Sequence, residues 1–300
     1  MESHHIPVMV EEVMILLRCE SHQTFVDATL GGGGHALEIL KRTGPDGMVI
    51  GMEWDEDALA VANKALMPYS KRVKIFRQNF VHLPNVLKTI GIERVDGILL
   101  DLGISSFQLE KGERGFTFKG EGPLDMRMDR RMDLSAADLV NTLSQGELEH
   151  ILSEYGEERW AKRIIKAIVR DREQAPIRTT QELRKIIHRA IPRRFHPRKI
   201  DAATRTFQAL RIRVNEELEN LKNLLEIGWK LLRKGGRICV ISFHSLEDRL
   251  VKQTFRRLEG DGMMDPVMCI ITKKPVTPSE EERRRNPRSR SAKLRCAERM

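Results

Sequence analysis

Cysteine, aromatic residues and long apolar runs are all scarce in this chain of 300 residues. Its four cysteines lie far apart and form no CxxC pair, which argues against a zinc site or a disulfide framework. No segment approaches the roughly 20 consecutive apolar residues that a membrane-spanning helix needs. The first residues also lack the basic-then-apolar pattern of a secretory signal. We therefore expect a cytoplasmic protein with reduced thiols, no metal and no membrane partner.

An excess of acidic residues is also absent, because 52 lysines and arginines face 43 aspartates and glutamates and leave a net charge of +9. Excess positive charge favours a polyanionic partner such as nucleic acid. The arginines concentrate near the C-terminus, where Arg284, Arg288, Arg290 and Arg295 are candidates for RNA contacts. A second basic segment, residues 193–199 (RRFHPRK), includes Arg194 and Arg198. These two side chains are expected either to contact phosphate groups or simply to be solvated in a loop.

Apolar runs alternate with helical patterns at both ends of the chain. The expected strands are residues 24–30, 48–53, 73–77, 95–101, 237–242 and 267–272. Such a βαβ rhythm predicts an α/β fold with a mostly parallel, doubly wound sheet. Between the fourth and fifth strands only helical spacing occurs, with N-cap patterns at Ser144 and Thr179. We expect one α/β domain, residues 1–109 and 212–300, interrupted by an all-α insert, residues 110–211. Residues 274–300 are polar and should lie on the surface, partly extended.

Four consecutive glycines follow the first expected strand, at residues 31–34. Glycines between a strand and a helix let the backbone turn tightly and approach a ligand closely. Glu53 ends the next strand, twenty residues after Gly33, which is the spacing at which a carboxylate meets the ribose of a bound nucleoside. Asp55 competes with Glu53 for this role, and Glu53 lies nearer the strand end. The pattern predicts a nucleoside site, but it fits S-adenosylmethionine and a dinucleotide equally well.

Asp101 at the end of the fourth strand favours S-adenosylmethionine. In open α/β sheets the reactive centre lies beyond the carboxyl ends of the strands near the first and fourth positions. The order of a Gly-Gly turn, a strand, a helix and a strand near the C-terminus is also similar to that of class I methyltransferases. The alternative enzyme is an NAD-dependent dehydrogenase, whose catalytic Lys, His or Tyr has no clear counterpart here. His35 and His82 are present, but neither has an evident partner in the sequence.

Several longer motifs together resemble one family. They include residues 5–9 (HIPVM), 27–35 (DATLGGGGH), 100–106 (LDLGISS), 114–118 (RGFTF), 122–129 (GPLDMRMD), 155–158 (YGEE), 203–211 (ATRTFQALR), 242–249 (SFHSLEDR) and 286–291 (NPRSRS). This set resembles the bacterial ribosomal RNA small-subunit methyltransferase H family, also called MraW, nearly end to end. The resemblance implies a class I methyltransferase domain with a helical insert that recognises RNA. It further implies methylation at N4 of a cytidine in the decoding region of small-subunit (16S) ribosomal RNA, with S-adenosylmethionine as cofactor.

The same resemblance implies which residues contact the cofactor. By motif these are Gly33, Gly34, His35, Glu53, Phe80, Asp101 and Gln108. One departure concerns Glu53, because the family usually has Asp there, in a run like Asp-Arg-Asp. A glutamate can still accept hydrogen bonds from both ribose hydroxyls, and Asp55 remains able to share the role.

Asp101 is also the candidate catalytic residue. Cytosine N4 is a poor nucleophile, and an oxygen that accepts one of its hydrogens would localise the nitrogen lone pair. Amino-methyltransferases commonly carry an Asp/Asn/Ser-Pro-Pro-aromatic motif at this strand end, whereas this chain has Asp101-Leu102-Gly103. The target base must leave its stack, and Phe243 and His244 are candidates to hold it.

Three points stay open at this level. A ribosome-assembly factor that binds RNA without catalysis would share these features. The substrate is either naked RNA or an assembled small subunit, and the oligomeric state is either monomer or homodimer.

Overall fold

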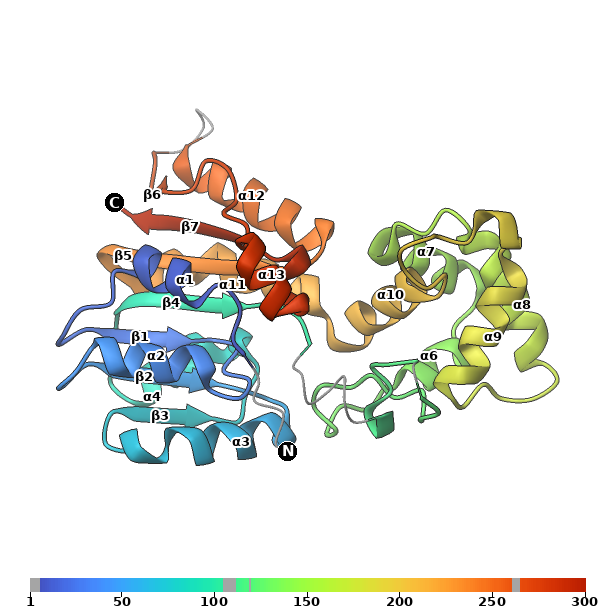
Figure 1. Cartoon of the computed structure of the whole chain (residues 1–300), viewed down its shortest axis with the longest axis horizontal. Coiled ribbons are helices and arrows are strands. Elements are labelled where there is room, and N and C mark those ends of the chain that lie inside the picture. Colours follow the sequence, from blue (N-terminus) through green and yellow to red (C-terminus); the bar gives the residue numbers. More distant parts are fainter. Residues whose placement is uncertain (1–5, 105–111, 119, 261–264) are drawn as a thin grey trace. The chain divides into compact units, whose positions relative to one another are not determined.

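The computed structural model describes residues 6–104, 112–118, 120–260 and 265–300. It divides into two compact units, residues 1–103 with 218–300, and residues 104–217 (Figure 1). No helix in the described part of the chain is long and apolar enough to cross a membrane.

The first unit is built on a sheet in the order β3-β2-β1-β4-β5-β7-β6. The strands are β1 Thr24–Asp27, β2 Met48–Met52, β3 Val73–Phe76, β4 Val95–Asp101, β5 Leu232–Ser242, β6 Met268–Ile270 and β7 Lys293–Arg299. Strands β1 to β5 are parallel, whereas β7 runs antiparallel to both β5 and β6. The chain order reverses on either side of β1 and β4, so their carboxyl ends flank the crevice where such sheets bind ligands. The expected doubly wound, mostly parallel sheet is confirmed.

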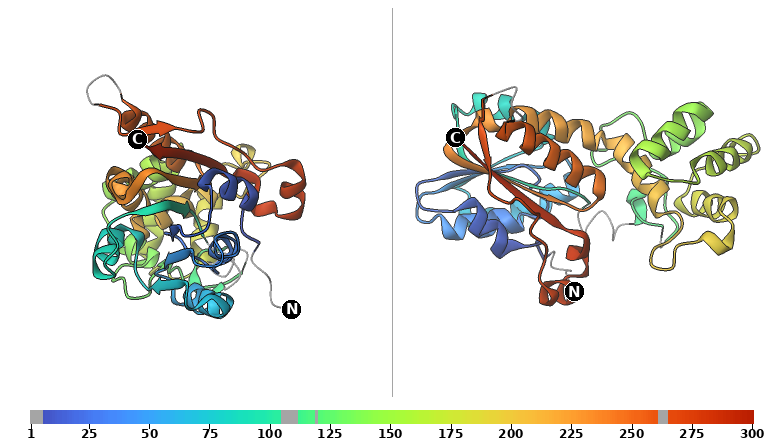
Figure 2. Two further views of the ribbon diagram at one scale, coloured as in Figure 1. Left: turned by 90° about the vertical axis from the view of Figure 1, so that its left-hand side faces the viewer. Right: turned by 90° about the horizontal axis from the view of Figure 1, so that it is seen from above.

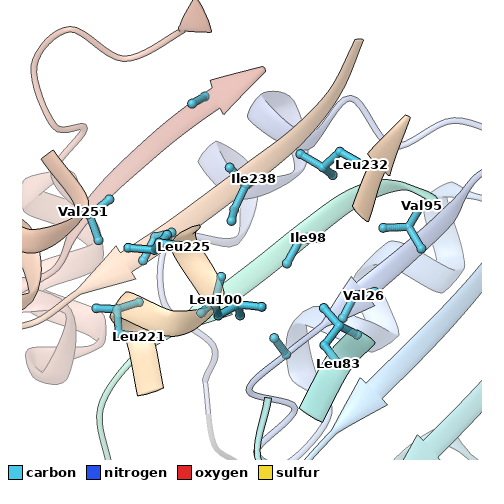
Figure 3. Close-up of a cluster of buried hydrophobic side chains, with 14 of the residues drawn as sticks. Val26, Leu83, Val95, Ile98, Leu100, Leu221, Leu225, Leu232, Ile238 and Val251 are labelled. Carbon is cyan, nitrogen blue, oxygen red and sulfur yellow. The ribbon is translucent and has the colours of Figure 1, made fainter. Parts of the chain in front are cut away.

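Helices cover both faces of this sheet, so each central strand is buried on two sides (Figure 2). Residues of α1 (Val10–Leu17), α2 (Gly34–Arg42) and α3 (Glu56–Leu66) share one apolar cluster with the strands. Residues of α4 (Leu83–Thr89), α11 (Glu217–Leu231) and α12 (Ser245–Glu259) share the other. Successive side chains of a strand point to opposite faces. Accordingly Leu99 of β4 belongs to the first cluster and Ile98 to the second. Figure 3 shows Ile98 among side chains of the second cluster.

The strength of this packing is testable at the centre of β4. Ile98 is fully buried, and replacing it with alanine removes three carbons that the surrounding helices and strands cannot refill. We expect Ile98→Ala to lower the free energy of unfolding by roughly 2–5 kcal/mol. Urea titration followed by circular dichroism measures this loss. A loss below about 1 kcal/mol would mean that the cluster repacks around the cavity.

The C-terminal segment corrects the expectation from sequence. Residues 274–300 do not simply lie on the surface, because β7 inserts between β5 and β6 and much of it is buried. Arg295 on this strand is 7% exposed, and its Nε donates to Asp248 Oδ1 at 2.7 Å. An ion-paired arginine inside a sheet is not available to RNA, which removes Arg295 from the candidate RNA contacts. The surface part of the segment is α13 (Glu280–Arg285) with the short helix η5 (Pro287–Ser291).

The second unit is helical. Its elements among the described residues are η3 Gly112–Arg114, α6 Ala136–Thr142, α7 Gln145–Gly156, α8 Ala161–Arg172, α9 Thr180–Ala190, η4 Arg193–Phe195 and α10 Thr204–Asn215. The expected N-caps are confirmed, because Ser144 and Thr179 each accept the backbone N–H of a glutamate three residues later. The charged run at residues 125–131 forms internal ion pairs, Asp125 with Arg127 and Asp129 with Arg131. Asn215 joins this run to α10, since its side chain bonds the backbone of Met126 and Met128.

Candidate functional site

The glycine run forms the turn between β1 and α2. Gly31 and Gly33 have φ angles of 52° and 84°, in the left-handed region where other residues are strained. A side chain at Gly34 would lie 2.9 Å from a carbon of Pro7, so the backbone there can pass only without a Cβ atom. The turn therefore exposes main chain at the carboxyl end of β1, as a nucleoside site requires.

Glu53 joins this turn to the end of β2. Its Oε2 accepts the N–H of Gly31 and its Oε1 accepts the N–H of Asp55, both at 2.8 Å. Burial raises the pKa of the Glu53 carboxyl to about 7, despite these hydrogen bonds, which lower it. Each carboxylate oxygen has a second lone pair, so Glu53 can bind a ribose hydroxyl while it holds the loop.

Asp55 has a different task. It is the N-cap of α3, where its Oδ1 accepts the N–H groups of Asp57 and Ala58 at 2.9 and 3.3 Å. The side chain is almost fully buried. Of the two carboxylates left open by the sequence, Glu53 is the one that faces the glycine turn.

Three acidic side chains, Asp27, Asp101 and Glu247, lie near the carboxyl ends of β1, β4 and β5. Burial raises the pKa of Asp27 to about 7. Burial, together with the charges of Asp27 and Glu247, raises the pKa of Asp101 well above its usual range. Among the described residues, no hydrogen-bond partner meets the buried Oδ2 of Asp27 or Oδ1 of Asp101. Buried carboxylates without partners are costly, and a ligand that carries positive charge would relieve that cost.

His35 lies in α2, behind Asp101. Its Nε2 is 2.9 Å from the carbonyl oxygen of Val8, so Nε2 carries the hydrogen, because a carbonyl can only accept. The other ring nitrogen, Nδ1, is 3.6 Å from Asp101 Oδ2. The side chain of His35 is therefore placed to position Asp101, a role that the sequence did not suggest for it.

The remaining predicted cofactor contacts lie in loops after strands. Phe80 begins the short helix η2 (Phe80–His82) beyond β3 and is partly buried against the second apolar cluster. Gln108 lies outside the described residues. Asp27 was missed in the sequence, although an acidic residue at the end of the strand before a glycine run was a usable signal.

Phe243 and His244 follow β5. A side chain at Gly103 would meet the Phe243 ring at 3.1 Å, which places this ring beside the end of β4, two residues after Asp101. His244 caps α12 and forms a capping box with Glu247, whose Oε2 also accepts the N–H of Phe243 at 2.8 Å. Both predicted base-binding residues thus lie at the same sheet edge as Asp101, although each also has a structural task.

The predicted RNA-binding arginines lie on two surfaces. Arg194 and Arg198 are exposed on the helical unit. Arg284 is exposed on α13, 3.6 Å from Glu280, and Arg288 and Arg290 are exposed on η5.

These residues fit S-adenosylmethionine. The glycine turn admits a ligand close to the backbone, and Glu53 can accept hydrogen bonds from ribose hydroxyls. To the positively charged groups of the cofactor, Asp27 and Asp101 each offer an oxygen that has no partner in the described part of the chain. A dinucleotide carries a negatively charged pyrophosphate, and buried carboxylates would repel it.

The chain is similar to known proteins along nearly its whole length. The model of the MraW methylase family matches residues 2–300. "Ribosomal RNA small subunit methyltransferase H" of Geotalea uraniireducens (strain Rf4) is 49% identical over 309 residues, covering 99% of each chain. The protein of the same name from Citrifermentans bemidjiense is 50% identical, again over 99% of each chain. A crystal structure titled a putative rRNA-methylase from Clostridium thermocellum covers 97% of this chain and 95% of its own at 13% identity, with a TM-score of 0.46.

The resemblance found in the motifs is therefore confirmed over the whole chain, and the dehydrogenase alternative falls. The chain belongs to the MraW methylase family and is an S-adenosylmethionine-dependent methyltransferase.

Proposed function

We propose that this protein methylates N4 of a cytidine in the decoding region of small-subunit ribosomal RNA. The observation that carries the proposal is the near 50% identity, end to end, with relatives named as ribosomal RNA small subunit methyltransferases. The net charge of +9 suits an RNA substrate. The reaction would take place in the cytoplasm, on naked RNA or on the assembled small subunit.

The cofactor site is proposed at the carboxyl ends of β1, β2 and β4. The backbone of Gly33, Gly34 and His35 would line it, and Glu53 would accept hydrogen bonds from the ribose hydroxyls. Phe80 and Gln108 would border the adenine. Asp27 joins this set because its buried Oδ2 has no partner in the described part of the chain. S-adenosylmethionine supplies an electrophilic methyl group carried on a sulfonium, and the chain supplies orientation and electrostatics.

Asp101 is proposed to act on the target amine. Its Oδ1 would accept a hydrogen of cytosine N4, while its Oδ2 lies 3.6 Å from Nδ1 of His35. Accepting that hydrogen localises the N4 lone pair and offsets the positive charge that develops on nitrogen. Positive charge bound nearby favours the ionised form of Asp101, which is the form able to accept.

Substrate RNA is proposed to bind through the helical insert, residues 110–211, and through the C-terminal arginines. Arg194, Arg198, Arg284, Arg288 and Arg290 are exposed and would contact phosphates. Phe243 and His244 would hold the flipped base beside Asp101.

Cofactor affinity should depend on pH. The pKa of Asp27 is raised to about 7, so the folded protein prefers this carboxyl protonated, and the stability it contributes is lost as pH rises from about 4 to 7. A positively charged ligand prefers the ionised carboxyl, so the affinity for S-adenosylmethionine rises as the pH rises through about 7. We expect S-adenosylmethionine to bind roughly tenfold more tightly at pH 8 than at pH 6 for each such carboxyl. Calorimetry at both pH values measures this, and Asp27→Asn should flatten the dependence. If the affinity did not change between pH 6 and pH 8, ionisation of these carboxyls would play no part in cofactor binding.

The substrate assignment is tested by mapping methylated nucleotides. Small-subunit RNA from cells that lack this protein should lose an N4-methyl group from one cytidine in the decoding region. Purified protein with radiolabelled cofactor should restore it, and parallel reactions on naked RNA and on assembled subunits identify the true substrate. Unchanged methylation of that RNA in the deletion strain would refute the proposal, and RNA binding without methyl transfer would leave only an assembly factor.

A further inference from the structure

Two aromatic rings meet on the surface of the helical unit. Trp160 is the N-cap of α8, and Phe195 lies in η4, 35 residues further along the chain. Their ring centroids are 5.1 Å apart with an interplanar angle of 43°. Phe195 is 38% exposed and Trp160 is partly exposed, so solvent reaches both residues.

An arginine lies over each ring of this pair. The guanidinium of Arg159 is 6.0 Å from the Trp160 ring centre, and that of Arg194 is 4.8 Å from the Phe195 ring centre. Within the described residues neither arginine forms an ion pair, nor do Arg163, Arg193 and Arg198 nearby. By contrast Arg184 and Arg189 on α9 pair with Asp201 and Asp171. We call Arg159, Trp160, Arg194 and Phe195 the arginine–aromatic surface.

Local stability does not account for this surface. The start of a helix carries positive partial charge, which disfavours cations there. Arg159 precedes α8, and Arg163 lies in its first turn, which contains no acidic residue. The acid at this helix start is the buried Glu158, whose Oε1 accepts the N–H of Trp160 at 2.8 Å. Trp160 provides no side-chain hydrogen bond as N-cap, a position where Ser, Thr, Asp or Asn is favoured. An exposed phenylalanine likewise gains little from burial. The arginines and the exposed ring thus add little to folding stability, and they suit a ligand with negative charge and flat rings.

We infer that the arginine–aromatic surface binds a single-stranded segment of the substrate RNA. Unstacked bases pack on aromatic rings and on guanidinium planes, and phosphates bind the unpaired arginines around them. Residues 193–199 contain four lysines and arginines and no acid, which matches a phosphate backbone better than a protein partner. Paired bases in a duplex have no free faces, so the segment bound is unpaired. The inference rests on the proposed function, because it takes RNA as the substrate.

Phe195 provides the test. Phe195→Leu keeps an apolar side chain but removes the aromatic ring, whereas Phe195→Trp keeps a ring. Ile200→Ala is the matched control, because Ile200 is an apolar residue 49% exposed in the same segment. With a fluorescein-labelled 12-nucleotide oligocytidylate, anisotropy should show roughly tenfold weaker binding for Phe195→Leu. Phe195→Trp and Ile200→Ala should bind as the parent protein does.

Trp160 reports stacking directly. In a protein with Trp54→Phe and Trp229→Phe, Trp160 is the remaining tryptophan. The oligocytidylate should quench its fluorescence, whereas inorganic polyphosphate, which offers charge without bases, should bind and leave it unchanged. Equal binding by Phe195→Leu and the parent, or quenching by polyphosphate as strong as by the oligonucleotide, would overturn the inference.

Methyl transfer separates this inference from the proposed function. If the parent protein methylates small-subunit RNA but Phe195→Leu binds the oligonucleotide normally, only the inference fails. If the parent protein transfers no methyl group to that RNA while the Phe195 effect persists, the proposed function fails and the binding surface stands.

Discussion

The Asp101→Asn protein is expected to transfer methyl groups roughly 10²- to 10⁴-fold more slowly than the parent at saturating cofactor and RNA. An amide oxygen accepts a hydrogen bond more weakly than a carboxylate and takes up no developing positive charge. The amide keeps the size of the carboxyl, and its NH₂ group can face Nδ1 of His35, so the fold should be preserved. Single-turnover transfer of a radiolabelled methyl group measures the loss.

Asp96→Asn is the matched control for this experiment. Asp96 lies on the same strand, five residues earlier, where its carboxylate pairs with Arg233 at the opposite sheet edge. That variant should keep the parent turnover. If Asp101→Asn also turned over at the parent rate, Asp101 would be at most a cofactor ligand and not the acceptor of the N4 hydrogen.

The Glu53→Gln protein is expected to bind S-adenosylhomocysteine roughly 100-fold more weakly. Both oxygens of Glu53 accept backbone N–H groups, from Gly31 and Asp55. Glutamine has one acceptor oxygen and one NH₂ group, so a donor would face a donor at one of the two positions. The glycine turn then loses an anchor, and the ribose loses a charged partner. Isothermal titration calorimetry measures the change.

Asp55→Asn provides the comparison that separates the two carboxylates. Asparagine caps helices as well as aspartate does, so α3 should remain intact, and cofactor affinity should stay within a few-fold of the parent value. The opposite pattern, with tight binding by Glu53→Gln and weak binding by Asp55→Asn, would assign the ribose to Asp55.

The parts of the fold that the sequence predicted are those with strong local patterns. Parallel strands such as β4 are covered on both faces, so they appear as continuous apolar runs. The helix starts at Ser144 and Thr179 were recognised because a capping box lies within four residues of chain. The glycine turn was visible for the same reason.

Strand β7 shows where local patterns fail. Its sequence, KLRCAER, contains four charged residues in seven and resembles a surface segment. Arg295 nevertheless lies inside the sheet because Asp248, 47 residues earlier on α12, neutralises it. Only the folded chain brings these two residues together, so the sequence of the segment alone could not predict a buried strand there.

The acidic residues at the strand ends were likewise predicted only in part from the sequence. Glu53 and Asp101 were predicted because strand ends beside a glycine turn are a local feature. The contact of His35 with Asp101 joins residues 66 positions apart, and Asp27 gains its raised pKa from burial beneath the helices. Such effects depend on which elements pack together.

From sequence alone come the α/β rhythm, the helical insert, the methylase family and the strand-end carboxylates, because each is encoded in neighbouring residues or in motifs of a few residues. The tertiary structure alone decided that Glu53 anchors the glycine turn, that Asp55 is a helix cap and that Trp160 meets Phe195. The physical reason is that hydrogen bonds, desolvation and ring contacts act over a few ångströms in space, whatever the separation along the chain.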